Sequence, residues 1–167
     1  MEILRPVKKN GMAEGRRARR KIRQREAPIE FTGVDENGND VSSDDYAGQV
    51  YVINLWYASC PPCRSEASDL KAVSEQYTDV PFLGVNISDS ADVAIAFNKK
   101  FEIAYPSIMD SATASVQLAL AGVVAPNAVP TTLVIDAEGR VAARISGLLR
   151  EQSILTSMID TVVDEGE

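Results

Sequence analysis

The sequence predicts an α/β fold, in which a central mixed β-sheet is flanked by helices. Its first half is predicted to run strand–helix–strand, and a crossover unit of this kind pairs its two strands in parallel. Its second half is predicted to end strand–strand–helix, with the strands in an antiparallel hairpin and the helix covering a face of the sheet. The chain has 167 residues, of which 45% are hydrophobic, and this is enough for one domain with a buried core.

The first half of the domain contains a turn, two strands and a helix. Asn37-Gly38, between short extended segments, predicts a hairpin turn near the start of the domain. Residues 50–57 and 81–87 are nearly continuous apolar runs, which are typical of strands buried on both faces. Between them, apolar residues at helical spacing predict a helix over about 62–77.

The second half is predicted to be richer in helix. Residues 93–101 and 116–120 have helical patterns. Residues 132–135 and 141–145 predict the two strands of the hairpin, because turn residues separate two short apolar runs. The apolar stripe over 154–163 predicts the last helix.

Charge divides the chain into two regions of opposite sign. Residues 1–26 carry ten Lys or Arg and three Glu, whereas the remaining 141 residues sum to −14. This division predicts a basic arm over 1–26, disordered or partly helical, and a domain over 27–167. Two interpretations of the arm stay open: sequence in place of a removed targeting segment, or a juxtamembrane stretch on anionic lipid. The acidic domain argues against nucleic acid as a partner.

Composition excludes several kinds of site. The chain contains no histidine, so Ser-His-Asp and Cys-His catalysis, His-based zinc sites and His-ligated haem are excluded. The longest apolar runs are too short to span a bilayer. A zinc site would need two Cys or His ligands beyond the two cysteines present, so no metal is expected.

The two cysteines, Cys60 and Cys63, follow the strand predicted over 50–57 and begin the next helix. A helix N-terminus stabilises a thiolate over a thiol, and in such Cys-X-X-Cys sites the pKa commonly falls to between about 3.5 and about 7.5. The two prolines between the cysteines are tolerated in a first helical turn. This geometry predicts that Cys60 is the exposed attacking thiolate and Cys63 the resolving thiol. No cofactor is expected beyond their redox-active disulfide.

Two separated motifs give the chain a family resemblance. Residues 52–66, Val-Ile-Asn-Leu-Trp-Tyr-Ala-Ser-Cys-Pro-Pro-Cys-Arg-Ser-Glu, resemble the active-site stretch of the extracytoplasmic thioredoxin-like family that includes the TlpA, ResA and DsbE proteins. Residues 129–136, with Gly139-Arg140, resemble the second signature of that family. The resemblance covers about 28–163. It implies a thioredoxin fold with an N-terminal β-hairpin extension and a helical insertion over roughly 93–127.

The resemblance also implies residue roles. Pro130 matches the family's cis-proline, and Val129 before it would offer its backbone to a partner strand; without the resemblance, Pro130 is an ordinary trans proline opening a strand. Glu66 matches an acidic residue placed near the resolving cysteine, where a carboxyl of raised pKa would take the proton from Cys63. Alternatively, Glu66 only favours the helix dipole.

Two further residues complete the expected site. Trp56 is expected to pack in the core beneath the cysteines and, to a lesser degree, to shield them. Ser59 stands where the family usually has Trp, so a large apolar contact is missing from the docking surface. With Val129 and Pro130, these two residues form the predicted substrate-binding set.

The predicted function is thiol–disulfide exchange with proteins, carried out by a monomeric reductant outside the cytoplasm. The resemblance implies protein thiols and disulfides as partners, for example apocytochrome c or its maturation factors, and an upstream membrane electron donor. It places the protein in the periplasm or on the outer face of the cell membrane, with a native membrane anchor or export signal missing from this chain. Two alternatives stay open: an oxidant forming disulfides in secreted proteins, and a redox-inactive binding module.

Overall fold

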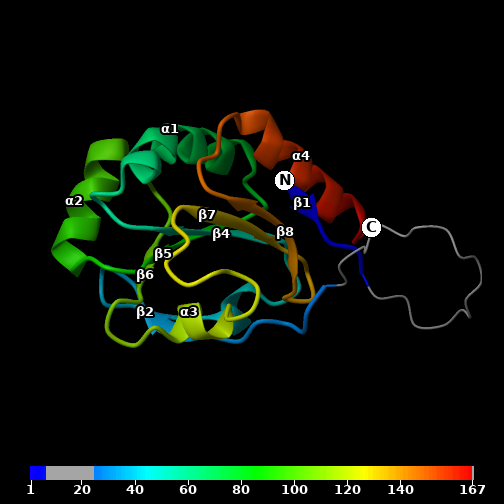
Figure 1. Cartoon of the computed structure of the whole chain (residues 1–167), viewed down its shortest axis with the longest axis horizontal. Helices are drawn as coiled ribbons and strands as arrows, with labels where there is room; N and C mark the ends of the chain where they lie inside the picture. Colours follow the sequence, from blue (N-terminus) through cyan, green and yellow to red (C-terminus); the bar gives the residue numbers. More distant parts are fainter. Residues whose placement is uncertain (7–24, 167) are drawn as a thin grey trace, which may run out of the picture.

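The computed structural model describes residues 1–6 and 25–166 (Figure 1). A six-stranded sheet has the order β1-β8-β7-β4-β5-β6, and β2 and β3 form a separate hairpin. The strands are β1 (Glu2–Ile3), β2 (Thr32–Val34), β3 (Asp40–Ser42), β4 (Tyr51–Trp56), β5 (Phe82–Asn86), β6 (Ser107–Met109), β7 (Thr131–Ile135) and β8 (Val141–Ser146). The helices are η1 (Ser43–Tyr46, a 3₁₀ turn), α1 (Pro61–Gln76), α2 (Ala91–Phe101), α3 (Ser115–Ala119) and α4 (Gln152–Asp164).

The sheet is mixed, as the sequence predicts. β4 pairs in parallel with β5, across the crossover made by α1, and β5 pairs in parallel with β6. β7 is antiparallel to both β4 and β8, so the second half of the chain contributes the predicted hairpin. The carboxyl end of β4 and the start of β7 therefore meet at one end of the sheet, where the site described below lies.

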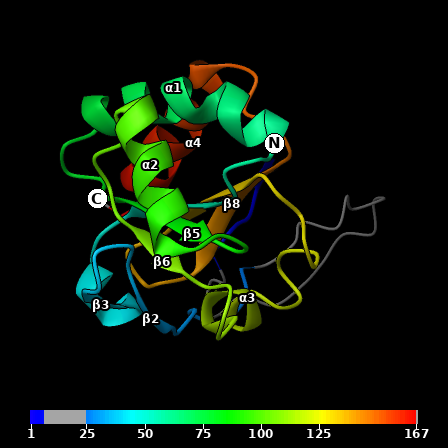
Figure 2. The same cartoon turned by 90° about the vertical axis from the view of Figure 1, so that its left-hand side faces the viewer.

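Three layers result, with the sheet in the middle. α1, α2 and α4 cover one face, whereas the β2–β3 hairpin and α3 cover the other (Figures 1 and 2). β4 supplies both cores because its side chains alternate: Ile53 and Leu55 pack toward the hairpin, and Val52 packs toward α1 and α4. Asn54 also lies on the side of α1, where its amide contacts Glu66.

Most predicted elements are found within two residues of their expected bounds. The helix predicted over 62–77 is α1, and the turn predicted at Asn37-Gly38 joins β2 to β3. The segment 93–127 is not purely helical, because it contains the edge strand β6 between α2 and α3. Three residues following a proline are too few to show a period of two, so β6 was not predicted.

The basic arm predicted over 1–26 falls mostly on residues 7–24, which lie outside the described residues. Its two ends are described, and both contact the domain. Glu2 and Ile3 form β1 at the edge of the sheet, paired with β8. The Arg25 side chain is buried and donates to the Leu4 carbonyl and to Asp136.

Candidate active site

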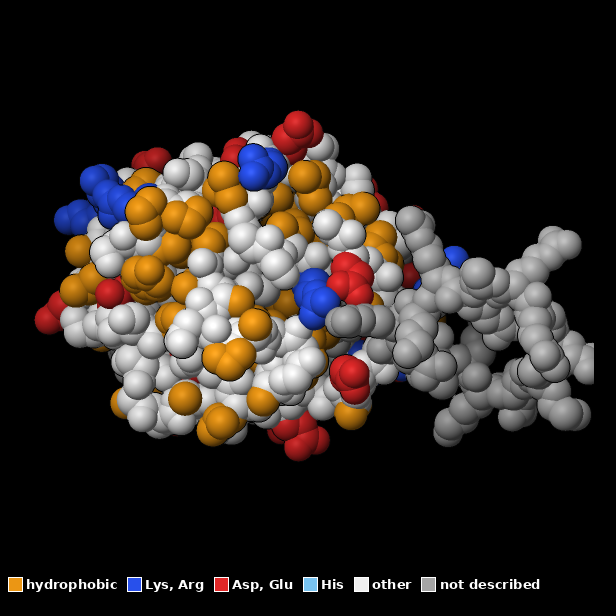
Figure 3. Space-filling view, in the orientation of Figure 1, with side chains coloured by type: hydrophobic (Ala, Val, Ile, Leu, Met, Phe, Trp, Pro, Cys, Tyr) orange, Lys and Arg blue, Asp and Glu red, His pale blue; other side chains and the backbone are white. Residues whose placement is uncertain are grey.

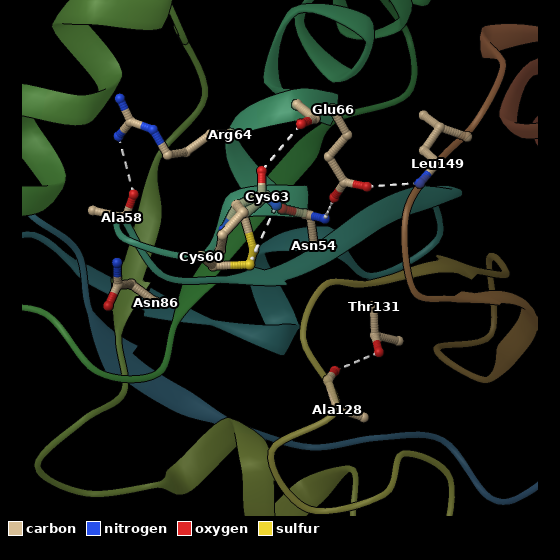
Figure 4. The surroundings of a disulfide bond; sticks show 12 residues. Asn54, Ala58, Cys60, Cys63, Arg64, Glu66, Asn86, Ala128, Thr131 and Leu149 are labelled. Atoms are coloured by element: carbon tan, nitrogen blue, oxygen red, sulfur yellow. Dashed lines mark hydrogen bonds between the residues drawn. A yellow bond between two sulfur atoms is a disulfide. The ribbon is translucent and has the colours of Figure 1, made fainter.

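Cys60 and Cys63 form a disulfide at the start of α1 (Figure 4). Their Cα atoms are 5.2 Å apart. Cys60 is the N-cap of the helix, and its Sγ accepts a hydrogen bond of 3.2 Å from the backbone N–H of Cys63. Pro61 and Pro62 occupy the first helical positions, where a missing N–H leaves no intrahelical bond unmade. In the reduced protein, the same N–H and the positive end of the helix dipole favour a thiolate on Cys60.

Neither sulfur is freely exposed in the disulfide form. Cys60 is 2% exposed and Cys63 is 3% exposed, so the predicted exposure of Cys60 is wrong for this redox state. Both cysteines are packed in a cluster with Trp56 and Phe97, and Val129 packs against this cluster. Exposure therefore does not distinguish the two sulfurs. The difference between them lies in helix position, because the N-cap sulfur is the one that accepts a helix N–H.

Glu66 lies one turn after Cys63 on α1 and is fully buried. Its Oε1 accepts a hydrogen bond of 3.1 Å from the Asn54 amide, and its Oε2 accepts one of 2.8 Å from the Leu149 N–H (Figure 4). Burial raises the pKa of the Glu66 carboxyl; the bonds from Leu149 and Asn54 offset part of this rise, and the charge of Asp69 adds to it. A carboxyl of this kind can exchange a proton closer to neutral pH than an ordinary Glu.

Trp56 packs beneath the cysteines, as predicted. Its ring lies 4.4 Å from that of Phe97, and its Nε1 donates a hydrogen bond of 3.0 Å to Ser107 Oγ on β6. The ring is 4% exposed, so its main role in this state is packing, and its place in the substrate-binding set stays a prediction. Ser59, in contrast, is exposed beside the disulfide.

The Val129–Pro130 peptide bond is cis, as the family resemblance implies. Pro130 is buried, and its carbonyl accepts a hydrogen bond of 2.9 Å from the Gly147 N–H. Thr131, which begins β7, donates through its hydroxyl to the Ala128 carbonyl at 2.5 Å (Figure 4). The segment is thereby fixed on the side of the disulfide opposite Glu66, with Val129 packed against the cysteine cluster. The partner-binding role of Val129 stays a prediction.

A clamp on the turn before Cys60 was not predicted. Asp89 Oδ2 accepts hydrogen bonds from the Ala58 N–H at 2.7 Å and from the Asn86 amide at 2.8 Å. On the other side, Arg64 donates to the Ala58 carbonyl at 3.1 Å. The signal available in the sequence is position: Asn86 ends β5 and Asp89 follows it, and the carboxyl ends of the parallel strands β4 and β5 lie at the same end of the sheet.

Within residues 1–6 and 25–166, no three His, Cys, Asp or Glu side chains group closely enough to hold a metal ion. No described helix is long and apolar enough to cross a bilayer.

A model of the AhpC/TSA family matches residues 24–144, most of the chain. The chain belongs to the AhpC/TSA family. The thiol:disulfide interchange protein HelX of Rhodobacter capsulatus is 30% identical to this chain over 142 residues, which cover 83% of this chain and 76% of HelX. Thiol-disulfide oxidoreductase ResA of Bacillus subtilis is 29% identical over 128 residues, or 74% of this chain and 68% of ResA.

Solved structures agree with this assignment. A secreted thiol-disulfide isomerase from Corynebacterium glutamicum superposes with a TM-score of 0.73 at 29% identity, covering 82% of this chain and 87% of that one. The predicted thioredoxin fold is confirmed. With a disulfide at the start of α1 and relatives of this kind, the chain is a thiol–disulfide oxidoreductase.

Proposed function

We propose that this enzyme reduces disulfides in partner proteins outside the cytoplasm. The observation that carries the proposal is the cysteine pair at the start of α1, with the buried carboxyl of Glu66 one turn farther along. The relatives ResA and HelX support disulfides as the group acted on, and the secreted isomerase supports the compartment. Apocytochrome c or a maturation factor is the partner we propose, and a membrane electron donor would restore the dithiol.

The reaction begins with the protein in its dithiol form. The Cys60 thiolate attacks one sulfur of the partner disulfide, which forms a mixed disulfide and releases the other partner sulfur as a thiolate. Cys63 then loses its proton to the Glu66 carboxylate and attacks Cys60 Sγ, which releases the partner's remaining thiolate. Two electrons pass to the partner, and the two partner thiolates take up the protons that Cys60 and Cys63 have lost.

Trapping tests this mechanism. Cys63→Ala should leave the mixed disulfide unresolved, so the enzyme should be recovered from cells covalently bound to its partners and released from them by a reductant. Cys60→Ser should trap nothing, because the attacking sulfur is missing. If Cys63→Ala recovers no partner and the wild-type enzyme reduces no insulin disulfide, the chain is a binding module and the proposal is wrong.

The direction of electron flow has its own measurement. A reductant is expected to equilibrate with glutathione at a potential near that of thioredoxin, about −270 mV. A potential near that of a strong oxidant, about −120 mV, would instead assign the enzyme to forming disulfides in secreted proteins.

A further inference from the structure

An apolar pocket lies on the hairpin side of the sheet, beside the disulfide. It has a volume of about 260 Å³ and is formed between α3 and the loop that leads to Pro130. Leu55, at the end of β4, and Ile87, just after β5, form its floor, and Leu118 on α3 stands at its rim. Its lining residues, all of them described, include no charged side chain. In Figure 3, hydrophobic side chains reach the surface over this region.

Val129 forms a wall shared by the pocket and the disulfide. It lines the pocket, and it also packs against the cluster that contains Cys60 and Cys63. Ala128, also in the lining, lies on the segment that passes below the disulfide in Figure 4. A polypeptide that brings a sulfur to Cys60 across Val129 therefore has its neighbouring residues over the pocket.

We propose that the pocket binds an apolar side chain of the substrate polypeptide, within three residues of its reacting cysteine. This inference rests on the proposed function and specifies the substrate. In an extended segment, residues rise about 3.3 Å each and alternate side chains share a face, so a neighbour of the cysteine can point into the pocket. A charged side chain would lose its hydration there without gaining a partner, whereas a Leu or Phe would be buried.

Two observations on the described residues favour a substrate side chain as the occupant. Leu118 is 69% exposed, the highest value for a large aliphatic side chain in the described part of the domain, and a bound chain would cover it. Ser59, beside the disulfide, is a small exposed polar residue, whereas the pocket offers a bound chain an apolar lining. A second copy of this chain is disfavoured, because each copy carries a formal charge of −7.

The probe is a set of synthetic peptides whose single cysteine carries a thionitrobenzoate group in a mixed disulfide. One Leu is moved through the three positions on either side of the cysteine, and the reference peptide has Ser at all of them. The Cys60 thiolate of Cys63→Ala attacks the peptide sulfur and expels coloured thionitrobenzoate, whose low-pKa thiol leaves fastest. Absorbance gives the second-order rate constant for each peptide.

We expect Leu at the best position to react about tenfold faster than Ser, as the burial of an aliphatic side chain predicts. In the Cys63→Ala background, Leu118→Asp should reduce this ratio below about threefold, since it places a carboxylate at the rim. Ala121→Phe, which fills the pocket from an exposed position, should do the same. The matched control is Ile95→Asp, which adds a charge at an exposed apolar position of α2 and should keep the full ratio.

The outcomes separate this inference from the proposed function. If all peptides react within about twofold of one another, the pocket does not select substrates, although the enzyme exchanges disulfides. If no peptide reacts, the proposed function itself fails. If light scattering instead finds a dimer that Leu118→Asp dissociates, and the peptide ratio stays unchanged, the pocket belongs to a self-association surface and the inference is overturned.

Discussion

The Glu66 carboxylate is held by two N–H donors and is fully buried, one turn from the resolving cysteine. As a base it must be ionised, so resolution of the mixed disulfide should slow as pH falls through its raised pKa. Glu66→Gln should resolve the mixed disulfide at least about a hundredfold more slowly and should lack this pH dependence. Rapid-mixing measurement of partner release across pH tests the prediction, with the exposed Glu75→Gln of the same helix as the control.

The same carboxyl should influence stability. Because the folded-state pKa is raised, the folded protein binds more protons than the unfolded chain between the ordinary pKa of Glu and the raised value. The free energy of unfolding should therefore decrease as pH rises through that window. Urea titrations of the oxidised proteins at several pH values measure this effect, and Glu66→Gln should not show the decrease. An identical dependence of the free energy of unfolding on pH in both proteins would contradict the prediction.

At this scale, the sequence identifies the reacting residues better than their surroundings. Cys60, Cys63 and Pro130 stand in motifs, so their places at the helix start and at a cis peptide bond were predictable. The complete burial of Glu66 was not, because it depends on Asn54 in β4 and on the Leu149 backbone, far away along the chain. The low exposure of Cys60 likewise comes from a cluster with residues such as Phe97 and Val129, which only the tertiary fold brings together.

Among the elements, the turn between β4 and α1 depends most on a distant segment. Asp89→Ala removes the acceptor of the Ala58 N–H and of the Asn86 amide, so it should lower the free energy of unfolding by about 1–3 kcal/mol. It should also slow the reaction of Cys60, because the turn that presents this cysteine loses one of its two anchors. Urea denaturation and the rate of Cys63→Ala trapping measure the two effects.

An exposed acidic residue provides the control for Asp89. Asp79 lies in the turn before β5 and is exposed, so Asp79→Ala should change stability by less than about 0.5 kcal/mol and leave trapping unaffected. Equal losses in both variants would mean that acidic charge, and not the clamp on Ala58, accounts for the effect.

Elements with a sustained pattern were predicted, whereas the two shortest strands of the sheet, β1 and β6, were not. The buried runs of β4 and β5 and the stripe of α4 extend over enough residues to reveal their period. β1 and β6 are two and three residues long, and pairing with β8 and β5 makes them strands. The hydrogen bond between Asp89 and the Ala58 N–H was not predictable for the same reason. It forms only because β4 and β5 pair and bring the segments that follow them together.

For the molecule as a whole, Arg25 joins the two ends of the chain. Its guanidinium donates to the Leu4 carbonyl at 2.8 Å, to Asp136 at 3.0 Å and to Glu165 beyond α4, and its side chain is 2% exposed. Arg25→Ala leaves the buried carboxylate of Asp136 with one fewer cation, so it should lower the free energy of unfolding by about 3 kcal/mol. Chemical denaturation measures this loss.

Two further variants define the role of Arg25. Arg25→Lys keeps the charge, but its ammonium group lacks the planar array of N–H donors by which the guanidinium binds three acceptors. Its free energy of unfolding should therefore lie between those of the wild type and Arg25→Ala. Arg150→Ala removes an exposed arginine and should have little effect. If Arg25→Ala were as stable as Arg150→Ala, the described ends of the arm would not be part of the folded unit.

The placement of the ends has a practical consequence. Figure 1 shows both termini on the side of the sheet away from α2 and from the start of α1. A bead or an electrode coupled through the amino group of Met1 would thus hold the protein with its sulfurs facing the bulk solution. An immobilised sample prepared in this way should exchange disulfides at nearly the rate of the free protein, whereas coupling through Lys100 on α2 would crowd the catalytic end.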